Sequence, residues 1–332
     1  MLKKIMAVIL SLFITASLLS ACAGNNADKA TGSDNGSTAD RHGKIKVVTT
    51  VFPLYDWVRE VARDDVDLSI DLLLDNGVDL HSYQPTAKDI MDISDCDLFV
   101  YVGGESDEWV EDVLRQANNK KMIVLDLMEI LGDKAKVEEL KEGMQGEEEE
   151  HEGEPEYDEH VWLSLKNAVT FTEKIAEALG KVDTQHAGSF SENAAAYMEK
   201  LSALDKEYQQ AVDDAKVKTL LFGDRFPFRY LTDDYGLDYY AAFVGCSAET
   251  EASFETVTFL SGKVDELGLK SIMQIETSDG SIAQTIRDNT KTKDQQILTL
   301  NSLQNSTAED IKSGTTYLGV MTENLEVLKK AL

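Results

Sequence analysis

The chain has 332 residues and carries a formal net charge of −29 at pH 7. An acidic excess of this size repels nucleic-acid phosphates and anionic lipid head groups, so it excludes docking on either by charge, whereas it attracts metal cations. After the N-terminal region about 290 residues remain, more than a single core usually serves, and we therefore expect two lobes.

The N-terminus has the features of an export signal. Lys3 and Lys4 precede an apolar run over residues 5–19 that is too short and wrongly flanked for a spanning helix. The run closes in the box LSAC at 19–22, which resembles that of bacterial lipoproteins. The resemblance implies a signal peptide over 1–21 and a lipid on Cys22 that anchors the protein on the extracytoplasmic face of the cell membrane. The alternative is an ordinary signal peptide cut nearby, with Cys22 incidental.

Residues 22–43 predict a flexible tether. The stretch is rich in Asn, Asp, Gly, Ser, Thr and Ala, and no large apolar residue occurs before Ile45. Such a composition cannot bury enough surface to offset its ordering entropy, and its Gly and Ser content makes it a coil. The fold is expected to begin near Lys44.

Strand and helix patterns alternate in the next part of the chain, which indicates βα units on a largely parallel sheet. The alternation stops over about 132–159, where the run EEEEHE at 147–152 predicts a solvated acidic loop. We expect strands over 45–50, 66–74, 97–102 and 121–127, and helices over 53–63, 85–93, 107–118 and 165–179.

A long helix is predicted within residues 181–215, because apolar residues recur every three or four positions from Phe190 to Val212. A second alternating set follows it, with strands over 217–223, 237–244, 272–275 and 297–300 and helices over 228–235, 254–267, 282–289 and 315–332. The predicted fold class is α/β, with two lobes over 44–180 and 216–332, each a mainly parallel sheet flanked by helices. The long helix joins them rigidly, and ligand would bind in the cleft beyond the carboxyl ends of the strands.

Metal-binding side chains follow several predicted strands. His81 and His160 lie in strand-exit loops of the first lobe, and Asp224, Glu276 and Asp279 follow strands of the second. Imidazole suits zinc, manganese and iron, and carboxylates complete the shell of such ions. Spacing alone does not separate a metal site from ordinary polar loops.

Three blocks of sequence carry a family resemblance: DLHSYQPTAKDI from Asp79, DEHVWLSLKNA from Asp158 and IETSDGSIAQTI from Ile275. They resemble the metal-binding lipoproteins of ABC importers for zinc and manganese, the cluster A-I or zinc-uptake binding proteins. The resemblance implies that His81 and His160 are metal ligands and that Glu276, or second to it Asp279, supplies a carboxylate. It also implies a non-enzymatic capture protein, expected as a monomer, that delivers its ion to an ABC permease and its ATPase.

The sequence departs from this family at the third ligand. The family usually has a His or a Glu there, whereas this chain reads FGDRFPFRYL at 222–231 and places Arg225 at that position. A guanidinium has no free lone pair and cannot coordinate a cation. Either Asp224 serves in its place, or water fills the position and Arg225 pairs with Glu276.

Zinc is the first choice of metal and manganese the alternative, since imidazole-rich sites favour zinc while manganese prefers oxygen donors. Two other functions stay open: a manganese- or iron-binding relative with an adhesin-like role in cell adhesion, and a zinc-dependent hydrolase, although no HExxH pair is present. Cys96 and Cys246 are expected to be two small buried thiols rather than a disulfide.

Overall fold

The computed structural model describes residues 44–63, 66–146, 156–247 and 251–332. These ranges belong to one compact unit, Gly43–Leu332. The predicted signal peptide, Cys22, the tether and the acidic run at 147–152 lie outside the described residues.

The first lobe is built on a four-stranded parallel sheet of order β2-β1-β3-β4. Its strands are short and β-branched or apolar, and the central strands β1 and β3 are almost fully buried, as expected for a parallel sheet covered on both faces. The strands are β1 (Ile45–Thr49), β2 (Leu68–Leu72), β3 (Leu98–Tyr101) and β4 (Ile123–Asp126). The helices are α1 (Phe52–Ala62), α2 (Ala87–Asp95), α3 (Trp109–Gln116), α4 (Leu127–Leu131) and α5 (Leu165–Val182).

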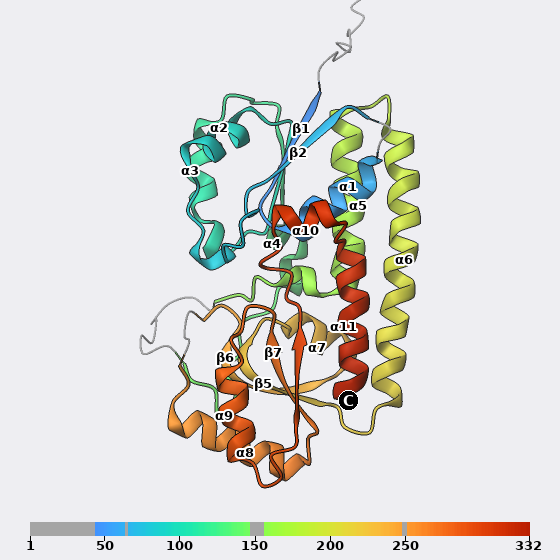
Figure 1. Cartoon of the computed structure of the whole chain (residues 1–332). Coiled ribbons are helices and arrows are strands. Elements are labelled where there is room, and N and C mark those ends of the chain that lie inside the picture. Colours follow the sequence, from blue (N-terminus) through green and yellow to red (C-terminus); the bar gives the residue numbers. More distant parts are fainter. Residues whose placement is uncertain (1–43, 64–65, 147–155, 248–250) are drawn as a thin grey trace, which may run out of the picture. The chain divides into compact units, whose positions relative to one another are not determined.

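The second lobe repeats the plan with a parallel sheet of order β6-β5-β7-β8. The predicted fold class, two lobes with parallel sheets flanked by helices, is therefore confirmed (Figure 1). The strands are β5 (Thr219–Phe226), β6 (Asp238–Val244), β7 (Ser271–Ile275) and β8 (Gln296–Leu300). The helices are α7 (Arg229–Tyr235), α8 (Phe254–Leu267), α9 (Ser281–Asn289), α10 (Ala308–Ser313) and α11 (Tyr317–Ala331).

Helix α6 (Ala187–Asp214) runs alongside both lobes and has 28 residues, a length of about 42 Å (Figure 1). Its buried residues are those of the apolar stripe read from the sequence, from Phe190 to Val212, together with Asn193. The helix packs on α1 and α5 of the first lobe and on α7 and α11 of the second. One continuous helix therefore limits how far the lobes can move apart.

The C-terminal part of the chain returns to the first lobe and ties it to the second. The Tyr317 hydroxyl at the start of α11 donates to the Trp162 carbonyl at 2.6 Å, and the Trp162 indole N–H donates to the Ser302 carbonyl at 2.9 Å. The Tyr317 backbone N–H also donates to Asp56 in α1 at 2.8 Å. Since all these groups are buried, breaking one bond would leave a costly unsatisfied partner.

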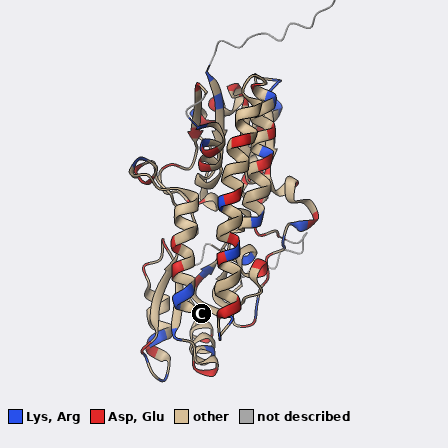
Figure 2. Cartoon of the chain, turned by 90° about the vertical axis from the view of Figure 1, so that its right-hand side faces the viewer, with Lys and Arg blue, Asp and Glu red and all other residues tan. Residues whose placement is uncertain are grey.

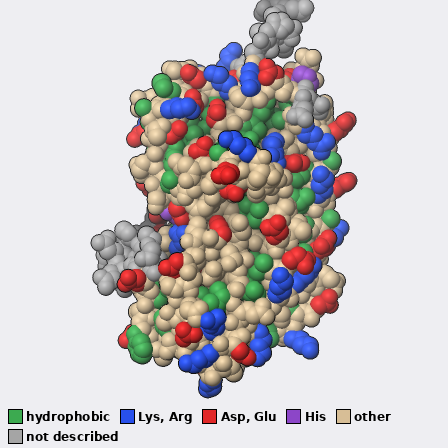
Figure 3. Space-filling model, in the orientation of Figure 1, with side chains coloured by type: hydrophobic (Ala, Val, Ile, Leu, Met, Phe, Trp, Pro, Cys, Tyr) green, Lys and Arg blue, Asp and Glu red, His purple; other side chains and the backbone are tan. Residues whose placement is uncertain are grey.

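Charged side chains of both signs are mixed along the outer helices and on the face seen in space-filling view (Figures 2 and 3). Hydrophobic side chains are scattered in small groups on that face. No helix within the described ranges is long and apolar enough to cross a membrane.

Asp56 generates a prediction about stability. Burial raises the pKa of its carboxyl from 3.8 to about 6, against the opposing effects of Arg59 and the Tyr317 N–H. An acid with a raised folded-state pKa stabilises the fold below its unfolded pKa, and that contribution is lost as the pH rises towards 6. Between pH 4 and 7 we expect the unfolding free energy of the wild type to fall relative to Asp56→Asn by up to about 3 kcal/mol.

Urea unfolding of both proteins at several pH values measures this difference. The exposed Asp288→Asn is the matched control, since it removes the same charge from the surface. The prediction would be contradicted if the free energies of unfolding of the wild type and of Asp56→Asn differed by the same amount at every pH in this range.

Candidate metal site

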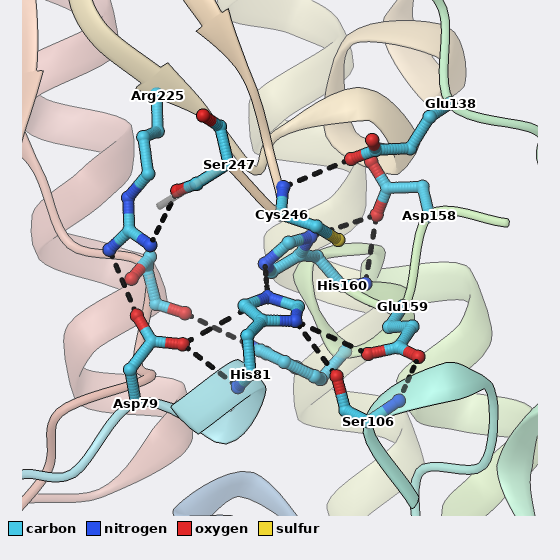
Figure 4. A network of polar contacts seen from close by, with 12 residues as sticks. Asp79, His81, Ser106, Glu138, Asp158, Glu159, His160, Arg225, Cys246 and Ser247 are labelled. Carbon is cyan, nitrogen blue, oxygen red and sulfur yellow. Dashed lines mark hydrogen bonds and ion pairs between the residues drawn. The ribbon is translucent and has the colours of Figure 1, made fainter. Parts of the chain in front are cut away.

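His81 is fixed by its own backbone and by two polar neighbours. It lies in the short 3₁₀ helix Leu80–Ser82, whose N-cap Asp79 accepts a hydrogen bond from the His81 N–H at 3.1 Å. The ring Nδ1 lies 2.8 Å from the Ser106 hydroxyl and 3.5 Å from Glu159 Oε2 (Figure 4). With Nδ1 occupied by these oxygens, Nε2 points away from them.

His160 is held in the same way and is fully buried. One carboxylate oxygen of Asp158 accepts from its backbone N–H at 2.8 Å and contacts its ring Nδ1 at 3.0 Å. A carboxylate only accepts hydrogen bonds, so in the neutral ring this contact places the proton on Nδ1 and the lone pair on Nε2. The Trp162 ring packs edge-on against the imidazole at a centroid distance of 5.4 Å.

The two histidines meet through their free nitrogens. His81 Nε2 and His160 Nε2 lie 3.3 Å apart, and the Cys246 side chain lies beside both rings (Figure 4). One ring nitrogen of each histidine and the Cys246 sulfur all lie within 4.8 Å of one another. Two nitrogens bound to one tetrahedral zinc at about 2.0–2.1 Å are about 3.3 Å apart, so the imidazole pair fits such an ion.

The pKa values of the two rings move in opposite directions. Burial and the neighbouring His160 lower the pKa of His81 to about 3, although Asp79 opposes the shift. Burial also disfavours the charged form of His160, but Asp158, Glu138 and Glu159 outweigh it and raise the pKa of that ring. The two rings are therefore not both positively charged, and His81 is neutral with a free lone pair at neutral pH.

Four carboxyl groups and one guanidinium surround the pair: Asp79, Glu138, Asp158, Glu159 and Arg225 (Figure 4). Burial raises the pKa of both Glu138 and Glu159. Glu159 accepts from the Ser106 N–H at 2.9 Å, and Glu138 accepts from the Cys246 N–H at 3.0 Å. The excess of acidic groups favours a cation between the two rings.

Arg225 pairs with Asp79 rather than with Glu276. Its Nη2 lies 2.9 Å from Asp79 Oδ2, and its Nη1 donates to the Ser247 carbonyl at 3.3 Å. The guanidinium thus connects the residue that orients His81 in the first lobe to the loop that follows β6 in the second.

Among the described residues, the group of side chains close enough together to hold a metal ion consists of His81, His160 and Cys246. The three carboxylates predicted from the sequence lie outside this group. Asp224 accepts from the Arg225 N–H at 2.8 Å and from the Ile275 N–H at 3.1 Å. It occupies the irregularity in β5 between Phe222 and Arg225 and so links β5 to β7.

Glu276 and Asp279 are also engaged by backbone groups. Both oxygens of Glu276 accept from Ser302, from its N–H at 2.7 Å and its hydroxyl at 2.8 Å, and burial raises the pKa of this carboxyl. Asp279 accepts from the Ser281 N–H at the start of α9, and hydrogen bonds from the Ser281 side chain and N–H lower the pKa of its carboxyl. Ligation by Asp224, Glu276 or Asp279 stays a prediction, since a carboxylate that accepts these bonds still has lone pairs for an ion.

The sequence interpretation did not include Cys246 in the site. The signal was present, because Cys246 follows strand β6 just as the other candidates follow their strands. A second signal was the spacing Asp-x-His in both motifs, since Asp79 and Asp158 each lie two residues before the histidine that they orient. The prediction that Cys96 and Cys246 are unpaired is confirmed, although Cys246 is only partly buried.

Comparison with known proteins gives the family. Residues 47–331 match the family described as ZnuA, zinc-uptake complex component A, periplasmic. The chain belongs to this family. The resemblance read from the three sequence blocks is therefore confirmed, and the match spans both lobes of the structure.

Three members of the ZnuA family illustrate the similarity. The zinc-binding protein AdcA of Streptococcus pyogenes is 33% identical over 294 residues, which cover 86% of this chain and 56% of AdcA, so the chain spans about half the length of that relative. The high-affinity zinc uptake system protein ZnuA of Bacillus subtilis is 30% identical over 97% of both chains. The crystal structure of the Zn(II)-bound ZnuA-like domain of Streptococcus pneumoniae AdcA has 31% identity and a TM-score of 0.69, and the match covers 87% of this chain and 99% of that domain.

The close approach of Gly104 to Glu159 generates a second prediction. Gly104 has φ +86°, and a Cβ there would lie 2.3 Å from Glu159 Oε1, the oxygen that accepts from Ser106. We expect Gly104→Ala to lower the free energy of unfolding more than the control Gly132→Ala, which has φ +51° and open space around it. The extra loss should be about 1–3 kcal/mol, because a buried carboxylate loses its partner, and thermal and urea unfolding measure it. Equal losses would show that only backbone strain matters.

Proposed function

We propose that this protein is the lipid-anchored zinc-capturing component of an ABC importer. It stands on the extracytoplasmic face of the cell membrane through Cys22, binds zinc between its lobes and passes the ion to a permease whose ATPase drives import. It performs no chemical reaction itself. The observation that carries the proposal is the pair of imidazoles, one buried and one partly buried, whose Nε2 atoms face each other at 3.3 Å.

The environment of the pair supports reversible capture of a cation. Each ring is oriented by an oxygen on Nδ1, an arrangement that keeps the tautomer and the ring position fixed in metal sites. His81 keeps 15% of its side-chain surface exposed and His160 none. An ion therefore reaches the pair from the side of His81.

Zinc is favoured over manganese by the chemistry of these donors and by the relatives. Imidazole nitrogen suits zinc, whereas manganese prefers carboxylate, carbonyl and water oxygens. The carboxylates closest to the rings, Asp158 and Glu159, contact the Nδ1 nitrogens rather than the Nε2 nitrogens. The relatives AdcA and ZnuA are named for zinc, and the ZnuA match extends over nearly the whole of both chains.

The arrangement of the lobes supports transfer by a small movement. Helix α6 packs on both lobes, and the bonds between Tyr317, Trp162 and Ser302 tie them together. The interface near the site also depends on the ion pair between Arg225 and Asp79. A protein held in this way opens its site by local rearrangement of loops rather than by wide separation of its lobes.

The decisive test compares zinc binding by the wild type, His160→Ala and His186→Ala. We expect one tightly bound zinc in the wild type and a loss of affinity of about 100-fold or more in His160→Ala, because the ion loses a direct ligand. His186→Ala is the matched control, since His186 pairs with Asp183 at the start of α6, away from the site. Metal content by elemental analysis and competition with a chelating dye measure both quantities.

Three outcomes would contradict the proposal. A wild type without tight zinc would remove zinc capture as the function. Zinc binding that His160→Ala and His186→Ala weaken equally would show that zinc binds elsewhere on this acidic protein. Hydrolytic turnover abolished by chelation would instead identify an enzyme.

A further inference from the structure

We propose that Cys246 is the third metal ligand of this protein, in place of the histidine or glutamate that Arg225 has displaced. The inference rests on the proposed function, since it assigns a further donor to the same zinc site. Its basis is geometric. The Cys246 sulfur and one ring nitrogen of each histidine lie within 4.8 Å of one another, and no other group of three His, Cys, Asp or Glu donors in the described ranges meets that distance.

The separation of the three donor atoms fits a single ion. With Zn–N distances of about 2.0 Å and a Zn–S distance of about 2.3 Å, tetrahedral donors lie about 3.3–3.6 Å apart. The two nitrogens are already 3.3 Å apart. The Cys246 sulfur lies no more than 4.8 Å from a ring nitrogen of each histidine, so a shift of about 1 Å towards those nitrogens, within the reach of a side-chain rotation, brings it to the separation that one ion requires.

The backbone around Cys246 is fixed on both sides of the residue. Before it, Gly245 approaches the His160 ring so closely that a Cβ would lie 3.1 Å from Cε1. The Cys246 N–H donates to Glu138 at 3.0 Å, and after it the Ser247 carbonyl accepts from Arg225 at 3.3 Å. These contacts hold the loop that follows β6 against the histidine pair.

Arg225 therefore has a structural role that is compatible with a metal beside it. Its guanidinium is turned to Asp79 and to the Ser247 carbonyl, and in this way it positions the loop that carries the sulfur. The predicted substitute Asp224 is held in β5 by the Arg225 and Ile275 N–H groups, whereas Cys246 lies in the cluster with both histidines. Glu276 stays the predicted carboxylate for the fourth position.

The chemistry of binding is balanced and has a consequence for metal choice. Zinc binds the sulfur as a thiolate, so the S–H bond breaks, a Zn–S bond forms and the proton leaves to solvent. Two imidazoles and a thiolate form a softer donor set than imidazoles with carboxylates. Such a set favours zinc over manganese more strongly, because manganese prefers oxygen ligands.

Cobalt substitution tests the proposal on the full chain, purified under reducing conditions. Cobalt bound by a thiolate gives a sulfur-to-metal charge-transfer band in the near ultraviolet. We expect this band in the wild type and in the control Cys96→Ser, in which a buried thiol that contacts Met122 is removed. We expect no band in Cys246→Ser, together with a loss of zinc affinity of about 10- to 100-fold.

A second measurement keeps the test valid if Cys246→Ser does not fold. Zinc should protect Cys246 of the wild type from alkylation by iodoacetamide, as read by mass spectrometry of the peptide that contains it. In Cys246→Asp the ratio of zinc affinity to manganese affinity should also fall, since an oxygen donor replaces sulfur.

The outcomes separate this inference from the proposed function. If the wild type binds one zinc that depends on His160 but shows neither the band nor protection of Cys246, zinc capture stands and the cysteine ligand is overturned. If the wild type binds no tight zinc, the proposed function itself fails.

Discussion

The contact at 3.3 Å between His81 Nε2 and His160 Nε2 is the interaction on which the centre of the molecule depends, because each ring is held through its Nδ1 so that the two Nε2 atoms face each other. A proton or a metal cation between the two nitrogens stabilises this arrangement. The Asp158 carboxylate, the Ser106 hydroxyl and Glu159 supply the contacts that maintain it. Much of the buried polar structure between the lobes therefore serves to orient two rings.

The fold could be predicted from the sequence because its signals are local. Apolar runs in the sequence predicted the strands of the described residues to within a few positions, and the apolar stripe from Phe190 to Val212 predicted α6. The short helices α4 and α10 were missed, since five or six residues carry little periodicity. For α10 a usable signal existed in the capping box formed by Thr307 and Asp310.

The site could be predicted only in part, for a physical reason. Strand ends identify which residues face a cleft, and they correctly placed His81 and His160 together. Strand ends do not show which groups a side chain forms hydrogen bonds with. Asp224 and Glu276 were expected to face a metal, yet both carboxylates accept from backbone N–H groups, while Arg225 reaches across to Asp79. These partners lie far apart in sequence, and no local pattern records them.

The unequal contribution of the lobes has a kinetic consequence. Both histidines belong to the first lobe, whereas Cys246 and the carboxylate candidates belong to the second. If Cys246 binds the ion, the first lobe alone offers a two-coordinate docking point, and residence time is set when the second lobe adds its donors. Unloading then requires only that the loop after β6 be drawn aside, which speeds dissociation without dismantling the part of the site that recognises the next ion.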